Sequence, residues 1–265
     1  MTREGGASGE SVAARQAALA ARARAYLDGP WRLLPAGRRL GPRLGGAAVL
    51  VVGAHALGAS GARTPLELEI LLGAEEWASW RAQARASEFL VTDPAAGASV
   101  RIRDEQWLAD RLAAAGGLWL RQRAVVVADP GDRFGTAVRT ALAACRRDQP
   151  RAVRHAYRAL RAGLAGADTV PDSLARKVLL GGAIEAALAL PVLCRAEPCP
   201  PPEWLGWYLA RISAEGAGIA ELCARVAAGT SVDGEAAAQL RRVIDELLDA
   251  AGFGEGIVRG YGQWS

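Results

Sequence analysis

The chain has 265 residues, of which 51% are hydrophobic, and a formal net charge of +4 at pH 7. It can therefore bury a sizeable core in one large or two modest domains, which excludes disorder as its default state. Nearly all basic residues are arginine and the single lysine is Lys177, a bias typical of GC-rich bacterial genomes. Because the arginines are spread along predicted helices beside acidic residues, we expect no nucleic-acid partner.

The N-terminus and the apolar segments predict a cytoplasmic protein with no membrane partner. The opening "MTREGGASGE" lacks the basic and apolar regions of a signal peptide. The longest apolar run, residues 178–194, contains Glu185 and is expected to fall short of a membrane span. The four cysteines are then expected as reduced thiols, and the spacing in "CRAEPC" is unusual for a zinc site.

Taken in order, the first elements predict an α/β domain. Residues 8–28 predict an amphipathic helix that begins at Ser8 or Ser11, and the prolines and glycines that follow predict irregular or short helical structure. The apolar "AAVLVVGA" predicts a buried strand at residues 47–54. After a glycine-rich loop, the alternation in "LELEILL" predicts a second strand at residues 66–72.

The next segments continue this mixed pattern. Residues 74–86 predict a helix, and residues 99–116 predict a strand that becomes a helix. Residues 118–134 carry an apolar segment that ends in an Asp-Pro-Gly turn, where Asp129 has the structural role of a turn former.

From residue 134 onward the pattern predicts five helical segments separated by Gly, Pro or Asp residues, and the second of them begins at Pro150. We therefore predict an α+β protein: a small mixed-sheet domain at residues 1–133, an all-helical bundle at residues 134–252 and an irregular glycine-rich tail at residues 253–265. Small-molecule pockets collect at domain junctions, so a ligand is expected in the cleft between the two domains.

Two carboxylates lie two residues apart on the second predicted strand. Glu67 and Glu69 should point to the same side of the strand, about 6–7 Å apart. This arrangement suits a divalent metal ion, and a glycine turn such as that at Gly53 can bring backbone N–H groups close to a phosphate. The alternative is an edge strand whose two glutamates are simply in water.

The order of these motifs resembles the DNA polymerase β-like nucleotidyltransferase superfamily, in particular a bacterial group with an accessory domain of unknown function. Gly53-Ala54 stands where that family has Gly-Ser, and Glu67-Leu68-Glu69 stands at the place of its Asp-x-Asp. Further along, "LWLRQRAVVVADPGDRF" is similar to an apolar segment that runs into Asp-Pro-x-Gly, and "PPEWLGWYLARI" to a Pro-Pro-Lys-Trp helix start. The resemblance implies a nucleotidyltransferase-like fold over most of the chain.

The departures from this family imply a degenerate active site. The serine that helps to hold the phosphates is Ala54, and both metal-binding aspartates are the longer Glu67 and Glu69. Mg²⁺ tolerates misplaced ligands poorly. A third carboxylate is expected on the next core strand, but that strand offers Arg101 and Arg103 there, with Asp104 and Glu105 only at its end. These arginines would form salt bridges with the glutamates in place of metal coordination.

Other residues complete the candidate site. His55 follows the Gly-Ala turn and is either a general base or a hydrogen-bonded structural histidine. The candidate catalytic residues are His55, Glu67 and Glu69, and the two glutamates would also hold Mg²⁺ if it binds. The candidate substrate-binding residues are Gly53, Ala54, Ser60, Arg101 and Arg103.

Three functions remain open from the sequence. The first is a nucleotidyltransferase-like protein that binds a small molecule and has weak or lost nucleotidyl transfer, with Mg²⁺ possible but not essential. The second is a metal-independent biosynthetic enzyme that uses acid–base residues of the same cleft. The third is a non-enzymatic interaction module. The sequence does not determine the substrate or the oligomeric state.

Overall fold

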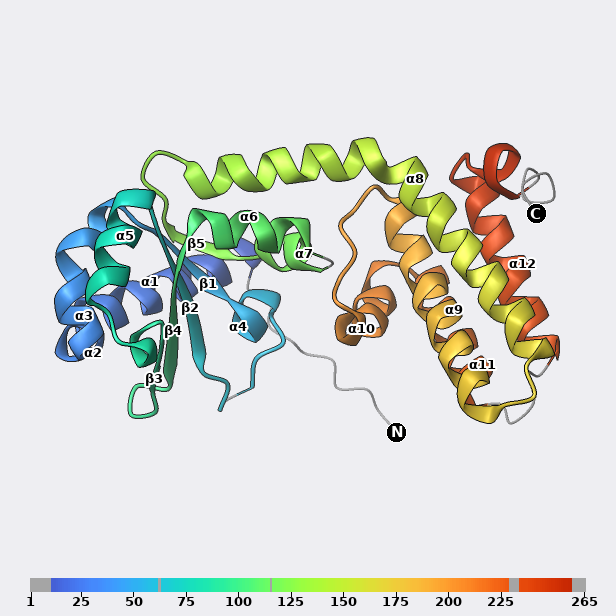
Figure 1. Cartoon of the computed structure of the whole chain (residues 1–265), viewed down its shortest axis with the longest axis horizontal. Helices are drawn as coiled ribbons and strands as arrows, with labels where there is room; N and C mark the ends of the chain where they lie inside the picture. The colour runs from blue at the N-terminus through green and yellow to red at the C-terminus, as the bar shows by residue number, and fades with distance from the viewer. Residues whose placement is uncertain (1–10, 62, 115, 229–233, 259–265) are drawn as a thin grey trace. The chain divides into compact units, whose positions relative to one another are not determined.

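The structure is a computed structural model that describes residues 11–61, 63–114, 116–228 and 234–258. The fold is α+β, as predicted, with a mixed sheet in the N-terminal part of the chain and helices after it. The elements can be followed along the chain in Figure 1.

The sheet formed by the described residues has five strands in the order β3-β4-β2-β1-β5. The strands are β1 (Ala48–Val52), β2 (Leu66–Leu72), β3 (Leu90–Asp93), β4 (Ala98–Asp104) and β5 (Val125–Ala128). β2 runs parallel to β4, and the other neighbouring strands are antiparallel. The register pairs Glu67 with Ser99 and Glu69 with Arg101, so the polar residues of β2 and β4 lie side by side.

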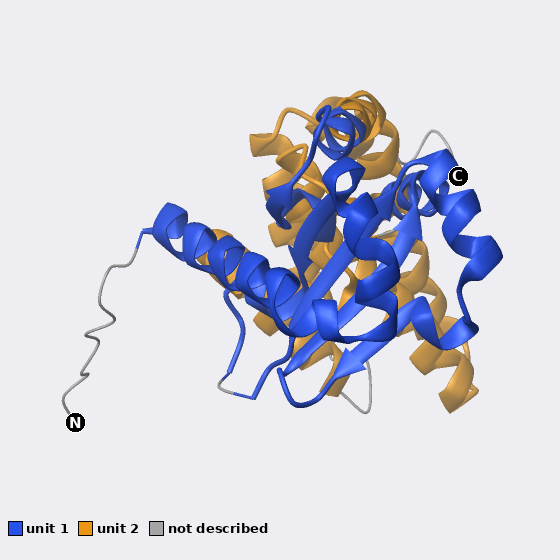
Figure 2. Ribbon diagram, turned by 90° about the vertical axis from the view of Figure 1, so that its left-hand side faces the viewer, with its two compact units in different colours: residues 1–114, 120–139 blue, residues 115–119, 140–265 orange. Residues whose placement is uncertain are grey.

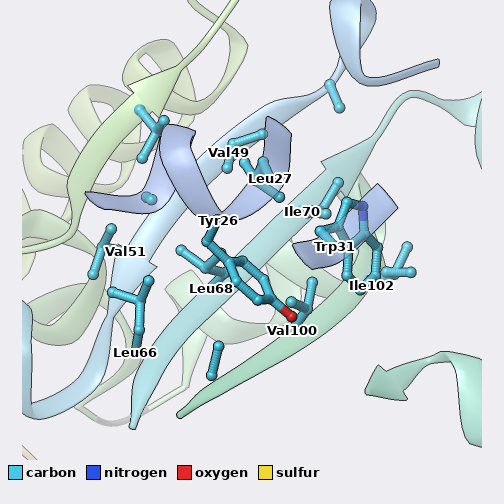
Figure 3. Close-up of a cluster of buried hydrophobic side chains, with 14 of the residues drawn as sticks. Tyr26, Leu27, Trp31, Val49, Val51, Leu66, Leu68, Ile70, Val100 and Ile102 are labelled. Carbon is cyan, nitrogen blue, oxygen red and sulfur yellow. The ribbon is translucent and has the colours of Figure 1, made fainter. Parts of the chain in front are cut away.

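Helices that precede β1 cover one face of the sheet. They are α1 (Val12–Asp28), α2 (Pro30–Leu33), α3 (Pro35–Leu40) and the 3-10 helix η1 (Gly41–Gly46), so residues 29–46 are short-helical, as expected. Figure 3 shows Tyr26, Leu27 and Trp31 in one cluster with side chains of the strands, such as Leu68 and Val100. These side chains form a continuous apolar core against this face.

The remaining helices of this part follow individual strands. They are α4 (Gly53–Leu57), α5 (Ala74–Gln83), the 3-10 helix η2 (Ala86–Glu88), α6 (Glu105–Ala113) and α7 (Gly117–Gln122). α6 begins directly after β4, and Asp104 caps it by accepting a hydrogen bond from the Trp107 N–H at 2.8 Å. This short connection places the first turns of α6 close to the end of β4.

The C-terminal part is helical, as predicted. It contains α8 (Arg133–Thr169), α9 (Ser173–Cys194), α10 (Pro202–Ile212), α11 (Ala214–Ala228), α12 (Gly234–Ala250) and the π-helix η3 (Gly254–Val258). Its core includes Tyr157, Leu160, Leu190, Ile219 and Leu240, all with no exposed surface. Tyr157 O–H donates a hydrogen bond to Asp245 Oδ1 at 2.8 Å and links α8 to α12.

Two segments of this part differ from the sequence prediction. α8 is one helix of 37 residues that continues through Pro150, where the sequence predicted two helices. The tail was predicted to be irregular from residue 253, but residues 254–258 form η3 and Ile257 is buried in the core. The rest of the tail, residues 259–265, lies outside the described residues.

The apolar helix α9 also differs from its prediction. Of the described helices it is the one that is long and apolar enough to cross a membrane, although the sequence run was expected to fall short. Core helices of globular proteins pass the same test of length and composition, and α9 supplies Leu180, Ala183, Ala187 and Leu190 to the core of the helical part.

The chain divides into two compact units, shown in blue and orange in Figure 2. The first contains residues 1–114 and 120–139, and the second contains residues 115–119 and 140–265. The division therefore falls within α8, six residues after the domain boundary that the sequence placed at residues 133 and 134.

Candidate functional site

The two glutamates of β2 share one face of the strand, as their spacing predicted. Leu66, Leu68 and Ile70 point into the apolar core on one face, so Glu67 and Glu69 point to the other. Figure 3 shows the labelled core side chains of this strand on the α1 side of the sheet. The glutamates therefore lie on the face away from that core.

Glu67 lies at the turn that follows β1. Arg101 Nη1 donates a hydrogen bond to Glu67 Oε2 at 3.1 Å, and the two side chains retain 35% and 25% of their exposure. Gly53 has a φ of +71°, and a Cβ at this position would overlap the Glu67 carboxylate. A glycine is thus needed both for the turn and for the close approach of Glu67, and the site remains open to solvent at this end.

Glu69 forms a buried ion pair that the sequence did not reveal. Arg121 Nη2, in α7, donates to Glu69 Oε1 at 2.8 Å, and the side chains are only 8% and 2% exposed. Glu69 Oε2 and Arg121 Nε are buried and have no hydrogen-bond partner among the described residues. Burial raises the pKa of Glu69, while Arg121 and then Arg101 oppose that rise. The ion pair is therefore incompletely satisfied.

Arginines also surround the indole ring of Trp107 on α6. The Cζ atoms of Arg121, Arg103 and Arg111 lie 5.0, 5.5 and 5.5 Å from its ring centroid. Cation–π attraction holds such groups near an aromatic face despite their mutual repulsion. Arg101 binds Glu67 and Arg121 binds Glu69, while Arg103 and Arg111 share the Trp107 ring with Arg121, so this arginine cluster (Arg101, Arg103, Arg111, Arg121) carries two more positive charges than the two glutamates balance.

The sequence located half of this cluster. Arg101 and Arg103 were predicted to form salt bridges with the glutamates. Arg101 does so with Glu67, but Arg103 forms no ion pair within the described residues, because its Nη1 donates to the backbone carbonyl oxygens of Ile102 and Phe89. Arg121, Trp107 and Arg111 were not identified. A charged residue inside the apolar "LWLRQR" and an aromatic residue four positions before an arginine were the available signals.

His55, the candidate general base, is held by the loop after α4. Its Nε2 lies 2.9 Å from the backbone carbonyl oxygen of Thr64. A carbonyl only accepts hydrogen bonds, so Nε2 carries the proton and only Nδ1 remains for a base. Ala54 lies in α4 and is half-buried, while Ser60 is exposed in the loop. Within the described residues, neither Ala54 nor Ser60 forms a hydrogen bond with Glu67 or Glu69.

Asp129 has the structural role that its sequence context predicted. Its two carboxylate oxygens accept hydrogen bonds from the N–H groups of Phe134 and Gly135, at 3.2 and 3.0 Å. These N–H groups lie in the first turn of α8 and have no carbonyl partner within the helix. Asp129 therefore caps α8 and is not part of the candidate site.

The described residues contain no group of three or more His, Cys, Asp or Glu side chains that could hold a metal ion. At the register position beside Glu69, where a third carboxylate was expected, β4 carries Arg101. No protein-family model matches the chain, and a search of curated proteins finds no match either.

Proposed function

We propose that the chain is a nucleotidyltransferase-like protein that binds a nucleotide beside Glu67 without Mg²⁺ and has lost nucleotidyl transfer. One observation carries this proposal: both glutamates that stand at the family's metal positions are paired with guanidinium groups, Glu67 with Arg101 and Glu69 with Arg121. The fixed arginine charges would act on the ligand in place of a metal ion.

The pairing opposes metal binding for two physical reasons. Mg²⁺ needs carboxylate oxygens at about 2.1 Å in near-octahedral geometry, but guanidinium N–H groups already occupy one oxygen of Glu67 and one of Glu69. The positive charges of Arg101 and Arg121, which contact the carboxylates directly, also repel a divalent cation. In-line transfer with two metal ions requires those same oxygens, so metal-dependent catalysis has little support at this site.

The open end of the site supports ligand binding. Glu67 and Arg101 keep part of their surface exposed and present an acceptor next to a donor. Such a pair can bind a ligand hydroxyl and a ligand oxyanion together. The acid–base alternative has less support because the Nε2 of His55 is engaged with a backbone carbonyl.

Isothermal titration of ATP into the full chain, with and without Mg²⁺, tests this proposal. We expect the same affinity in both conditions, and we expect Arg101→Gln to weaken binding about tenfold because one charge-assisted hydrogen bond is lost. Arg22→Gln is the matched control, since Arg22 is an exposed arginine of α1 in the same unit. Binding that requires Mg²⁺, or no binding of ATP in either condition, would overturn the proposal.

A further inference from the structure

Two arginines of the cluster differ from the other two in their partners. Arg101 and Arg121 are each neutralised by a glutamate. Within the described residues, Arg103 and Arg111 form no ion pair, although both guanidinium groups lie 5.5 Å from the Trp107 ring centroid. Their charges are therefore left over after the glutamates have been paired.

Arg103 is fixed in position by the sheet. Its Nη1 donates to the backbone carbonyl oxygens of Ile102 and Phe89, at 3.0 and 3.3 Å. A guanidinium group has five N–H donors, so the other nitrogens of Arg103 remain able to bind a ligand. Burial lowers the pKa of Arg103, Glu69 opposes this, and the nearby Arg101 and Arg111 lower it further. A bound anion would relieve that repulsion.

Arg111 approaches the same indole ring from α6. It follows Trp107 by four residues, so both lie on one face of the helix. Arg111 is exposed, and Arg103 and Trp107 are each half-buried, so a solute can approach all three side chains. Asp110, its neighbour in the chain, accepts a hydrogen bond from Gln106 instead.

We propose that Arg103, Arg111 and Trp107 form an oxyanion site that binds a phosphate group. This inference deepens the proposed function, and it rests on that function only for the identity of the whole ligand. Two guanidinium groups that form no ion pair within the described residues match the double negative charge of a phosphate monoester, and planar N–H pairs bind phosphate oxygens in a bidentate manner. A monocarboxylate would neutralise only one of the two charges.

Isothermal titration of inorganic phosphate into the full chain, in a metal-free buffer of low ionic strength, tests the site directly. We expect saturable binding that Arg111→Gln weakens about tenfold and Arg103→Gln/Arg111→Gln weakens further. Arg22→Gln, which removes the same charge from exposed surface of the same unit, should bind phosphate as the wild type does. Acetate, with its single charge, should bind at least about tenfold more weakly than phosphate.

The single Arg111→Gln variant should fold as the wild type does, because the Arg111 side chain is exposed. The side chain of Arg103, in contrast, is bonded to the backbone of β4 at Ile102. Unchanged phosphate affinity in Arg111→Gln, or acetate binding as tight as phosphate, would overturn the inference. If ATP binds without Mg²⁺ but is unaffected by the Arg103 and Arg111 substitutions, the proposed function stands and this site is wrong. If phosphate binds at the site but ATP does not bind, the site stands and the proposed function fails.

Discussion

Removal of the Arg121 guanidinium should cost far more stability than removal of the whole ion pair. Arg121→Met leaves Glu69, whose side chain is 2% exposed, without its cation. At the observed 2.8 Å the attraction is about 6 kcal/mol at an effective dielectric constant of about 20, and it offsets the desolvation of both charges. Breaking a buried pair typically costs about 3–5 kcal/mol, whereas exchanging both partners for apolar residues is often neutral.

The assay is urea unfolding of the full chain at pH 7, followed by far-UV circular dichroism. We expect Arg121→Met to lose about 3–5 kcal/mol and Glu69→Leu/Arg121→Met to recover most of that loss. The exposed pair of Arg32 and Asp28, whose side chains are 64% and 70% exposed, supplies the control. Arg32→Met should cost no more than about 0.5 kcal/mol.

The pH dependence of the stability of Arg121→Met provides a second, independent test of the buried ion pair. Burial already raises the pKa of Glu69 above its ordinary 4.5, and removal of Arg121 takes away the main opposing charge. The folded Arg121→Met protein should then bind a proton that the unfolded chain has lost, so its deficit shrinks as the pH falls from 7 towards 4.5. A cost below about 1 kcal/mol at pH 7, or a double variant less stable than Arg121→Met, would refute this reasoning.

Three further predictions concern other parts of the fold. Gly53→Ala should destabilise the protein by about 1–3 kcal/mol in urea unfolding, because the residue has a positive φ and its new Cβ would overlap Glu67. Asp129→Ala should cost about 1–2 kcal/mol in the same assay, since two N–H groups of α8 lose their acceptor. Tyr157→Phe should reduce the loss of folding stability that occurs between pH 10 and 12. The pKa of Tyr157 is raised from 10.0 to about 12 by burial and by its bond to Asp245, so its stabilising contribution is present below pH 10 and is lost as the pH rises to 12.

Each of these predictions has a control and a contrary outcome. Gly61→Ala adds a Cβ that meets no atom closer than 3.9 Å, and a loss equal to that of Gly53→Ala would contradict the steric argument. An unfolding midpoint of Asp129→Ala equal to that of wild type would show that water replaces the cap without cost. For Tyr157→Phe, stability is measured at pH 8 and pH 11, and an equal decline in both proteins would assign the alkaline loss to other groups.

The local patterns of the sequence predicted the strand that carries the site. The alternation in β2 fixed the direction of Glu67 and Glu69, because side chains of a strand alternate strictly between faces. The same rule put Arg101 on the glutamate side of β4, where the parallel register pairs it with Glu69 and its side chain reaches diagonally to Glu67.

Contacts between distant segments were not predictable in this way. Arg121 follows Glu69 by 52 residues, and no period connects a strand to a short helix so far along the chain. The four-residue strand β3 is too short for alternation to be seen. Pro150 predicts the start of a new helix, because proline lacks the N–H group that a helix interior needs. In the structure α8 continues through Pro150, and Tyr157 and Leu160 of the same helix are buried in the core.

The buried pair of Glu69 and Arg121 also links two positions in evolution. A single replacement at either position leaves a charge without its partner in the interior, so intermediate sequences would be selected against. Homologous chains should therefore keep both residues or exchange both, and variation at residue 69 should covary with variation at residue 121. Replacement of the pair would therefore require changes at both positions, which makes the pairing hard to reverse.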